Sequence, residues 1–228
     1  MKRLLLILLP GIASIVALSV HAGGIALGGT RIIYPQESHQ VEVSVRNTSD
    51  KSSFLVQSWV DDKNGNKVNS FFVTPPLYVS APGNENKLRL IYSGLPLPSD
   101  RESLFYFNSK AVPSVSKSET ENKNVLVIAA TTRVKLFVRP EGLKPSVEDA
   151  PGKLKFSRTG DKLIIDNPTP YYITIGELKI GGVTVKDALM ISPKDKLTKK
   201  IPGMSGEISV RTINDYGAYT QPLTFNFH

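Results

Sequence analysis

Cysteine is absent from the 228 residues, and only three histidines and one tryptophan are present. Without cysteine the chain can form no disulfide, no thiolate metal site, no iron–sulfur cluster and no cysteine nucleophile. His21 and His228 lie towards the two ends and His39 stands alone, so no histidine cluster exists for zinc or for a Ser–His arrangement. The chain therefore lacks most of the side chains that enzymes and metalloproteins rely on.

The remaining motifs of catalytic and metal sites are incomplete. Residues 203–206 (GMSG) are one residue too short for a nucleophile elbow. The paired glycines at 28–29 and 181–182 lack the lysine and the spacing of a phosphate-binding loop. Residues 61–66 (DDKNGN) vaguely resemble a calcium loop, but the glycine is misplaced and the closing glutamate is missing, so a solvated hairpin tip is the better interpretation. We expect no enzyme activity, no cofactor and no metal.

Positive charge predominates, with 28 Lys and Arg against 20 Asp and Glu and a net charge of +8. Alone, this balance would indicate nucleic acid or a membrane surface as the partner. However, Lys2 and Arg3 precede an apolar run at 4–20, and residues 20–22 (VHA) resemble a small-residue cleavage signal. We predict a secretory signal peptide over residues 1–22. A membrane anchor fits less well, because the run is shorter than the about 20 residues of a typical span.

Cleavage of this leader would remove Lys2 and Arg3 and so reduce the net charge from +8 to +6. A secreted protein meets little nucleic acid. We therefore expect no nucleic-acid partner and no membrane insertion after cleavage, and the basic balance needs another explanation.

Alternating apolar and polar residues dominate the chain after the leader. Residues 41–46 (VEVSVR) show the period of two that is typical of a strand with one buried face. Turn residues separate further runs rich in β-branched and aromatic residues, at 54–60, 71–73, 87–92, 104–108, 125–138, 162–166, 172–180 and 208–213. Residues 64–66 (NGN) and 82–84 (PGN) are predicted to be hairpin turns. The pattern predicts an all-β protein built from sandwiches.

The domain boundary is expected in the stretch richest in proline and glycine, at 140–152. This predicts an N-terminal domain at 23–140, a linker at 141–151 and a C-terminal domain at 152–228. A second polar stretch, 114–124, lies between two strong strand patterns and is predicted to be a long loop.

Residues 125–138 (VLVIAATTRVKLFV) form an unusual predicted strand, because the first half is apolar on both faces. Such a strand must bury both faces. We expect Val125, Val127 and Ala129 to face the domain's own core, which leaves the alternate residues in need of a second cover. Either the neighbouring domain or loop covers them, or the strand is an exposed edge that another protein completes.

Five motifs carry a family resemblance. They are residues 97–113 (LPSDRESLFYFNSKAVP), Thr30-Arg31, 135–140 (KLFVRP), 167–172 (NPTPYY) and 213–217 (INDYG). In content and order they resemble the signature of the periplasmic pilus chaperones, the PapD-like family. The absence of cysteine favours the subfamily with a short loop before the long strand.

The resemblance implies two immunoglobulin-like β-sandwich domains arranged in an L shape, with a cleft between them. It also implies a chaperone that binds, folds and caps pilus subunits in the periplasm without ATP and delivers them to an outer-membrane usher. The chaperone's long strand would complete the subunit's unfinished sandwich. A self-capping homodimer of the free chaperone is a further partner to consider. The alternative is a two-domain secreted adhesin or structural subunit of the same fold.

Two cations match the family's grip on the subunit's C-terminal carboxylate, namely Arg31 and Lys135. A guanidinium can hold a carboxylate with two hydrogen bonds while an ammonium adds a point charge. Outside its motif, each would simply be a surface charge. Thr30 and Thr174 match auxiliary hydroxyls near the same carboxylate.

Leu126, Ile128 and Ala130 match the donor side chains that enter the subunit's groove. Alternation places Lys135 on the opposite face of the strand from Leu126. The strand must therefore twist or bulge between Ala130 and Lys135, or the cleft must lie on the other face there. Three charged residues match a family ion-pair network between the domains, which would fix the angle of the cleft: Glu102, Arg139 and Asp215.

Overall fold

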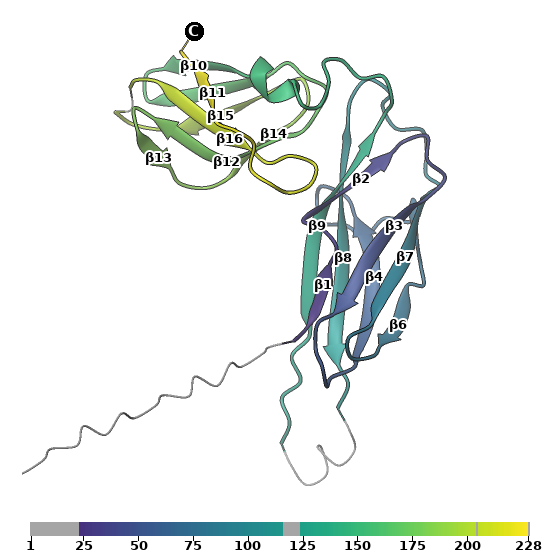
Figure 1. Cartoon of the computed structure of the whole chain (residues 1–228). Helices are drawn as coiled ribbons and strands as arrows, with labels where there is room; N and C mark the ends of the chain where they lie inside the picture. Colours follow the sequence, from purple (N-terminus) through teal and green to yellow (C-terminus); the bar gives the residue numbers. More distant parts are fainter. Residues whose placement is uncertain (1–22, 116–123, 204, 228) are drawn as a thin grey trace, which may run out of the picture.

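The structure is a computed structural model, and it describes residues 23–115, 124–203 and 205–227. The predicted signal peptide and most of the predicted loop at 114–124 lie outside the described residues. Figure 1 shows two β-rich domains that meet at an angle and form an L. No helix in the described part of the chain is long and apolar enough to cross a membrane.

The N-terminal domain is a sandwich of two sheets. One sheet has the strand order β1-β3-β7-β5 and the other has the order β2-β9-β8-β4-β6. The strands are β1 (Ile25–Leu27), β2 (Arg31–Pro35), β3 (Val41–Asn47), β4 (Phe54–Asp61), β5 (Phe71–Thr74), β6 (Leu77–Ser80), β7 (Glu85–Tyr92), β8 (Ser103–Pro113) and β9 (Ala130–Arg139).

Apolar residues that alternate with polar ones along the strands fill the core of this domain, as the sequence predicted for β3. Val43 and Val45 of β3 are buried, while Glu42 before them and Arg46 after them are exposed. Buried residues of β7 and β8, such as Leu88 and Phe107, meet them from the two sheets. The apolar faces of the strands are thus removed from water, which is the main stabilising contribution in such a sandwich.

The N-terminal segment contributes to both sheets. Residues 25–27 of β1 pair antiparallel with β3, and residues 31–35 of β2 then pair parallel with β9. The change of sheet occurs at Gly28, whose amide donates to the Ser44 carbonyl at 2.9 Å. This crossing brings Arg31 beside β9.

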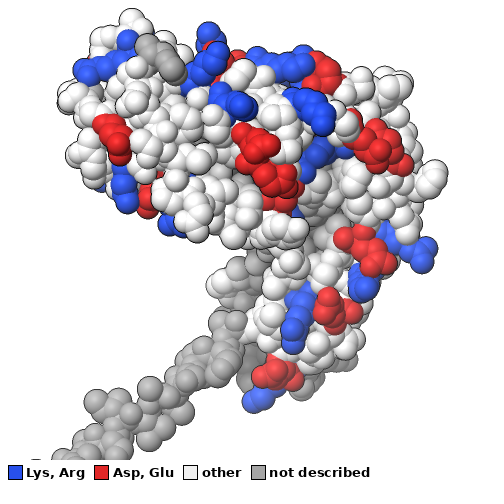
Figure 2. Space-filling view, turned by 45° about the horizontal axis from the view of Figure 1, so that its top comes forward, with Lys and Arg blue, Asp and Glu red and all other residues white. Residues whose placement is uncertain are grey.

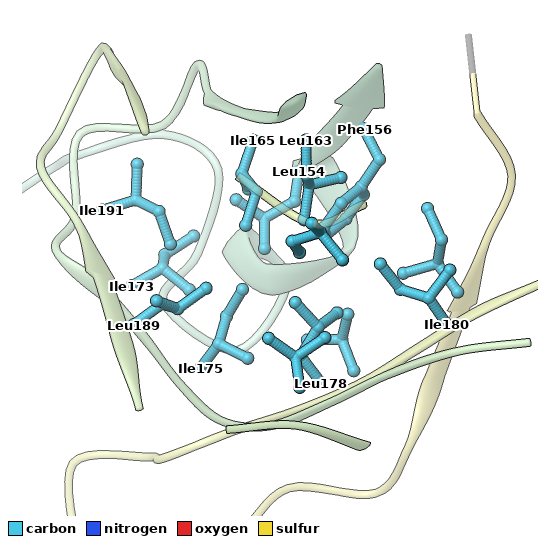
Figure 3. Close-up of a cluster of buried hydrophobic side chains, with 14 of the residues drawn as sticks. Leu154, Phe156, Leu163, Ile165, Ile173, Ile175, Leu178, Ile180, Leu189 and Ile191 are labelled. Atoms are coloured by element: carbon cyan, nitrogen blue, oxygen red, sulfur yellow. The ribbon is translucent and has the colours of Figure 1, made fainter. Parts of the chain in front are cut away.

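The C-terminal domain is a second sandwich, with a three-stranded sheet β10-β11-β15 and a five-stranded sheet β13-β12-β16-β17 in which β14 also pairs with β12. Its elements are η1 (Ala150–Lys153), β10 (Lys155–Thr159), β11 (Lys162–Asn167), β12 (Ile173–Ile180), β13 (Val183–Val185), β14 (Leu189–Ile191), β15 (Asp195–Lys200), β16 (Ile208–Thr212) and β17 (Leu223–Phe225). Figure 3 shows leucine, isoleucine and phenylalanine side chains from both sheets packed in its core. The predicted all-β, two-sandwich fold is confirmed.

The predicted linker at 141–151 packs against the second domain. Leu143 and Val147 contact its core, and the Tyr171 hydroxyl donates to the Pro145 carbonyl at 3.1 Å. These contacts attach the linker to the C-terminal sandwich. The exact domain limits stay a prediction.

Two local predictions were wrong. The turn at 82–84 joins β6 to β7, which belong to different sheets, so it is a crossing rather than a hairpin. The strand predicted at 125–138 begins only at Ala130, and Val125 and Val127 are 43% and 41% exposed instead of facing the core. The turn at 64–66 does form a hairpin, in which the Asp62 amide donates to the Asn66 carbonyl at 2.8 Å.

Candidate functional site: a cation pair beside the interdomain cleft

Arg31 and Lys135 are direct register partners on the parallel strands β2 and β9. Partners in register have side chains on the same face of a sheet. Both reach the C-terminal domain: an Arg31 terminal nitrogen donates to the Ile213 carbonyl at 3.0 Å, and Lys135 Nζ donates to Thr174 Oγ1 at 3.3 Å. The structure thus brings together the two cations that the sequence singled out.

Neither cation forms an ion pair with any residue that the structure describes. Ten ion pairs connect the residues that the structure describes, and none includes Arg31 or Lys135. Arg31 Nε is buried and makes no hydrogen bond. Two half-buried positive charges on neighbouring strands therefore lie together without a carboxylate in direct contact, since Asp215 and Glu102 act on Arg31 only from a distance. This arrangement is suited to an incoming anion.

Burial lowers the pKa of both cations in the free protein. Desolvation lowers the pKa of Arg31, and the carboxylates of Asp215 and Glu102 oppose this shift. Desolvation also lowers the pKa of Lys135, and the neighbouring charge of Arg31 lowers it further. A bound carboxylate would reverse these effects, since it stabilises the charged form of each group.

A cavity of about 270 Å³ opens between the domains beside Arg31. Its walls come from β2, β9, β12 and the turn that follows β16, and they include Arg31, Glu102, Arg139, Tyr172, Thr174, Ile213, Asp215 and Tyr216. Lys135 does not line this cavity and reaches it only through Thr174. The cleft implied by the family resemblance is therefore present, and Arg31 is the member of the cation pair that lines it.

The two predicted hydroxyls have different surroundings. Thr174 is 4% exposed and accepts the hydrogen bond from Lys135, so it lies beside the cation pair. Thr30 is exposed and packs against Gly217 of the other domain, closely enough that any side chain on Gly217 would collide with its hydroxyl. Thr30 therefore contributes to the contact between the domains.

The three predicted ion-pair residues meet at the domain boundary. Arg139 Nε donates to Glu102 at 2.7 Å, and its two terminal nitrogens donate to the Asp215 carboxylate at 2.6 and 2.8 Å. Desolvation raises the pKa of Glu102, which is 3% exposed, and Arg139 counteracts it. For Arg139, burial lowers the pKa but the hydrogen bonds to Asp215 and the charge of Glu102 outweigh it, so the pKa is raised.

The predicted donor residues lie at the far end of the same strand. Leu126 and Ile128 are 84% and 70% exposed, and Ala130, the first residue of β9, is exposed as well. On one side β9 pairs with β8 over residues 130–138, but on the other side β2 pairs only with residues 135–139. Residues 130–134 therefore form an edge within the described part of the sheet.

The register of β9 shows how one strand presents both features. Pairing with β8 runs without a shift from Val138 to Ala130, so no bulge intervenes. Val134 and Leu136 point into the core, and Lys135 lies on the opposite face. The cleft thus lies on the face of β9 opposite the core. Of the alternatives that the sequence left open, a twist, a bulge or a cleft on the other face, this is the last.

Comparison with known proteins decides the family. Residues 24–144 match the model described as "Pili and flagellar-assembly chaperone, PapD N-terminal domain", and residues 149–224 match "Pili assembly chaperone PapD, C-terminal domain". The chain belongs to the pilus-assembly chaperone family. This confirms the predicted family, and because the family is not enzymatic, the chaperone is not an enzyme.

Relatives and solved structures agree with this assignment. The chaperone is 44% identical to the probable fimbrial chaperone SfmC of Escherichia coli K12, over 100% of both chains, and 42% identical to the chaperone protein FimC of the same strain, over 95% of this chain and 91% of FimC. The periplasmic chaperone SfaE superposes with a TM-score of 0.76 at 42% identity, covering 88% of this chain and 98% of SfaE. The structure of Salmonella enterica SafA pilin in complex with the SafB chaperone matches with a TM-score of 0.80 at 31% sequence identity, covering 89% of this chain and 95% of the matched chain.

The sequence interpretation missed aromatic residues of the chaperone's cleft. The backbone amide of Tyr172 donates a hydrogen bond to Glu102 at 2.8 Å. The ring of Tyr171 lies 5.3 Å from the Arg139 guanidinium, and Tyr216 lines the cavity. All three belong to motifs that carried the family resemblance as whole segments, without a role for each residue. For Tyr216 the available signal was its position directly after Asp215, whereas the motif that holds Tyr171 and Tyr172 contains no charged residue.

Proposed function

We propose that the chaperone binds, folds and caps pilus subunits in the periplasm by donor-strand complementation and passes them to an outer-membrane usher without ATP. One observation carries the proposal: the strand that holds an unpaired cation beside the cleft continues into a free edge with exposed apolar side chains. A carboxylate-binding site and a vacant sheet edge on one strand suit a partner that arrives as an extended chain end.

The cation pair is proposed to hold the C-terminal carboxylate of the subunit. Arg31 has a buried Nε without a partner, and Lys135 has only the neutral Thr174 hydroxyl. Figure 2 shows acidic and basic side chains interspersed on the face it displays, without a continuous basic surface. The selectivity for a carboxylate is therefore expected from this local pair rather than from diffuse positive charge.

The donor strand is proposed to supply backbone hydrogen bonds and side chains to the subunit. No described strand pairs with the outer edge of residues 130–134, and the side chains of Leu126 and Ile128 are exposed to solvent beyond the end of the core. Fully burying a leucine or isoleucine contributes about 1.5–3 kcal/mol. Ala130 would fill less of the groove, so Leu126 and Ile128 should dominate this part of the affinity.

A free edge with exposed apolar residues is a liability for a protein without its partner. This supports the proposal that the free chaperone covers the segment by forming a homodimer. A two-domain adhesin of the same fold explains the sandwiches but gives no role to two unpaired cations beside such an edge.

Copurification from periplasmic extract tests the proposal. Wild-type chaperone should yield a stoichiometric complex with a pilus subunit, and Arg31→Ala or Lys135→Ala should lose it while circular dichroism shows an intact fold. Lys155→Ala is the control, because it removes a positive charge from an exposed site in the other domain. Normal complex formation by both cleft variants would contradict the carboxylate-binding role.

A further inference from the structure

Tyr216 is the most exposed large apolar side chain in the described part of the chain, with 92% of its surface accessible. It lies in the turn after β16, which Figure 1 shows in yellow as a loop that reaches towards the N-terminal domain. It also lines the interdomain cavity together with Arg31. A large aromatic side chain that is nearly free of contacts at the rim of a binding cleft is available to a partner.

The exposure of Tyr216 does not come from a loose loop. The side-chain oxygen of Asn214 accepts hydrogen bonds from the amides of Tyr216 and Ala218 at 3.1 and 2.9 Å, and the Asn214 amide donates to the Ala218 carbonyl at 2.9 Å. Gly217 closes the turn with a φ of 83°, a conformation that favours glycine. The turn is thus internally braced.

The N-terminal domain also holds this turn from outside. Asp215 is gripped by Arg139 of β9, and Gly217 packs against Thr30. The residue that opens the turn, Ile213, accepts the hydrogen bond from Arg31 at 3.0 Å. The backbone that carries Tyr216 is therefore fixed relative to the unpaired cation.

We propose that Tyr216 is a specificity-determining residue that packs against the side chain of the subunit's C-terminal residue while Arg31 and Lys135 hold its carboxylate. The inference rests on the proposed function and deepens it. A carboxylate at Arg31 places the last side chain of an extended chain end at this cavity rim, where a rigid phenol ring offers an apolar face at little cost in conformational entropy. The site should favour subunits that end in an aromatic or long apolar residue.

Chemical protection of Tyr216 is the direct test. Tetranitromethane should nitrate Tyr216 in the free full-length chaperone, and nitration of this residue should fall at least fivefold in the purified complex with a pilus subunit. Tyr219, in the same loop and 52% exposed, serves as the internal reference because its ring already packs on Arg211. Equal nitration of Tyr216 with and without bound subunit would overturn the inference.

Affinity measurements with subunit variants give a second test. Tyr216→Ala should weaken binding about fivefold or more for a subunit whose last residue is phenylalanine and change it little for one that ends in alanine, whereas Tyr216→Phe should bind both as the wild type does. Equal effects of Tyr216→Ala on both subunits would contradict the specificity role.

Failure of the proposed function has a different signature. If Arg31→Ala and amidation of the subunit's C-terminus leave binding unchanged, the carboxylate grip is wrong, whatever the nitration result. If those two changes abolish binding while Tyr216 stays fully reactive in the wild-type complex, only the role of Tyr216 is wrong. Absence of any complex would contradict both.

Discussion

Arg139 grips the Asp215 carboxylate across the domain boundary through two hydrogen bonds of 2.6 and 2.8 Å. The same guanidinium donates to Glu102 at 2.7 Å, and Glu102 in turn accepts the backbone amide of Tyr172 at 2.8 Å. Each carboxylate thus links Arg139 to the C-terminal domain, directly or through Tyr172. This side chain is therefore a central link among the contacts that set the relative position of the cleft walls.

Arg139→Ala should destabilise the chaperone severely. It leaves Glu102 buried without its counter-charge, and removing one partner of a buried ion pair costs about 3–5 kcal/mol. Urea unfolding should show the loss, and small-angle X-ray scattering should show a larger radius of gyration as the domains separate. Lys87→Ala, which breaks an exposed pair with Glu42, should have a far smaller effect; a stability change no larger than in this control would contradict the structural role of Arg139.

The affinity for the subunit should fall as the pH rises, and the fall should begin at a lower pH than the ordinary pKa of lysine would predict. Burial, assisted by Arg31, lowers the pKa of Lys135 below its ordinary value of 10.5. Only the protonated ammonium attracts a carboxylate, so affinity falls as the pH rises through the lowered pKa. Calorimetric titrations of subunit binding between neutral and strongly alkaline pH should follow this decline.

Lys135→Arg is the matched control for that titration, because arginine stays charged throughout. Its affinity should depend much less on pH over the same range. An identical decline in wild type and Lys135→Arg would show that Lys135 is not the titrating group.

Leu126→Ala and Ile128→Ala should each weaken subunit binding about tenfold or more without affecting the stability of the free chaperone. Both side chains are exposed in the monomer, and their burial by a bound subunit would contribute about 1.5–3 kcal/mol each, where about 1.4 kcal/mol is a factor of ten. Surface plasmon resonance measures the affinities. Val127→Ala, on the intervening position, is the control, and an equal loss in this variant would argue against a specific donor face.

Asp61→Ala should destabilise the N-terminal domain by about 1–3 kcal/mol, because it leaves buried donors unsatisfied. Asp61 is 6% exposed and accepts hydrogen bonds from Trp59 Nε1 at 2.9 Å and Asn108 Nδ2 at 2.8 Å. Trp59 is the only tryptophan, so its fluorescence reports the unfolding of this domain. Stability equal to that of wild type would show that the cluster contributes nothing.

The alternation of apolar residues was enough to locate the long strands, as β3 shows, because each has one buried face. The strands β6 and β13, of four and three residues, were missed because they carry too few side chains to produce a period. The segment β2 was missed for another reason: it is short, and its parallel pairing with β9 involves residues far apart in the chain. Only the family resemblance joined Arg31 to Lys135.

The orientation of β9 was predicted wrongly because the prediction was drawn from residues 125–129, which lie beyond the end of the core and are apolar at every position. The informative alternation comes later, where Lys135 separates the buried Val134 and Leu136. The buried core ends where the strands that neighbour β9 end. This limit cannot be seen in the sequence of β9 alone.

Hydrogen exchange of the amides in residues 125–132, with and without a bound pilus subunit, tests the central claim most directly. Donor-strand pairing predicts slow exchange across this segment in the complex and fast exchange in monomeric free chaperone, because the subunit's strands would complete the edge. Exchange that stays equally fast in a stoichiometric complex would contradict the donor-strand mechanism.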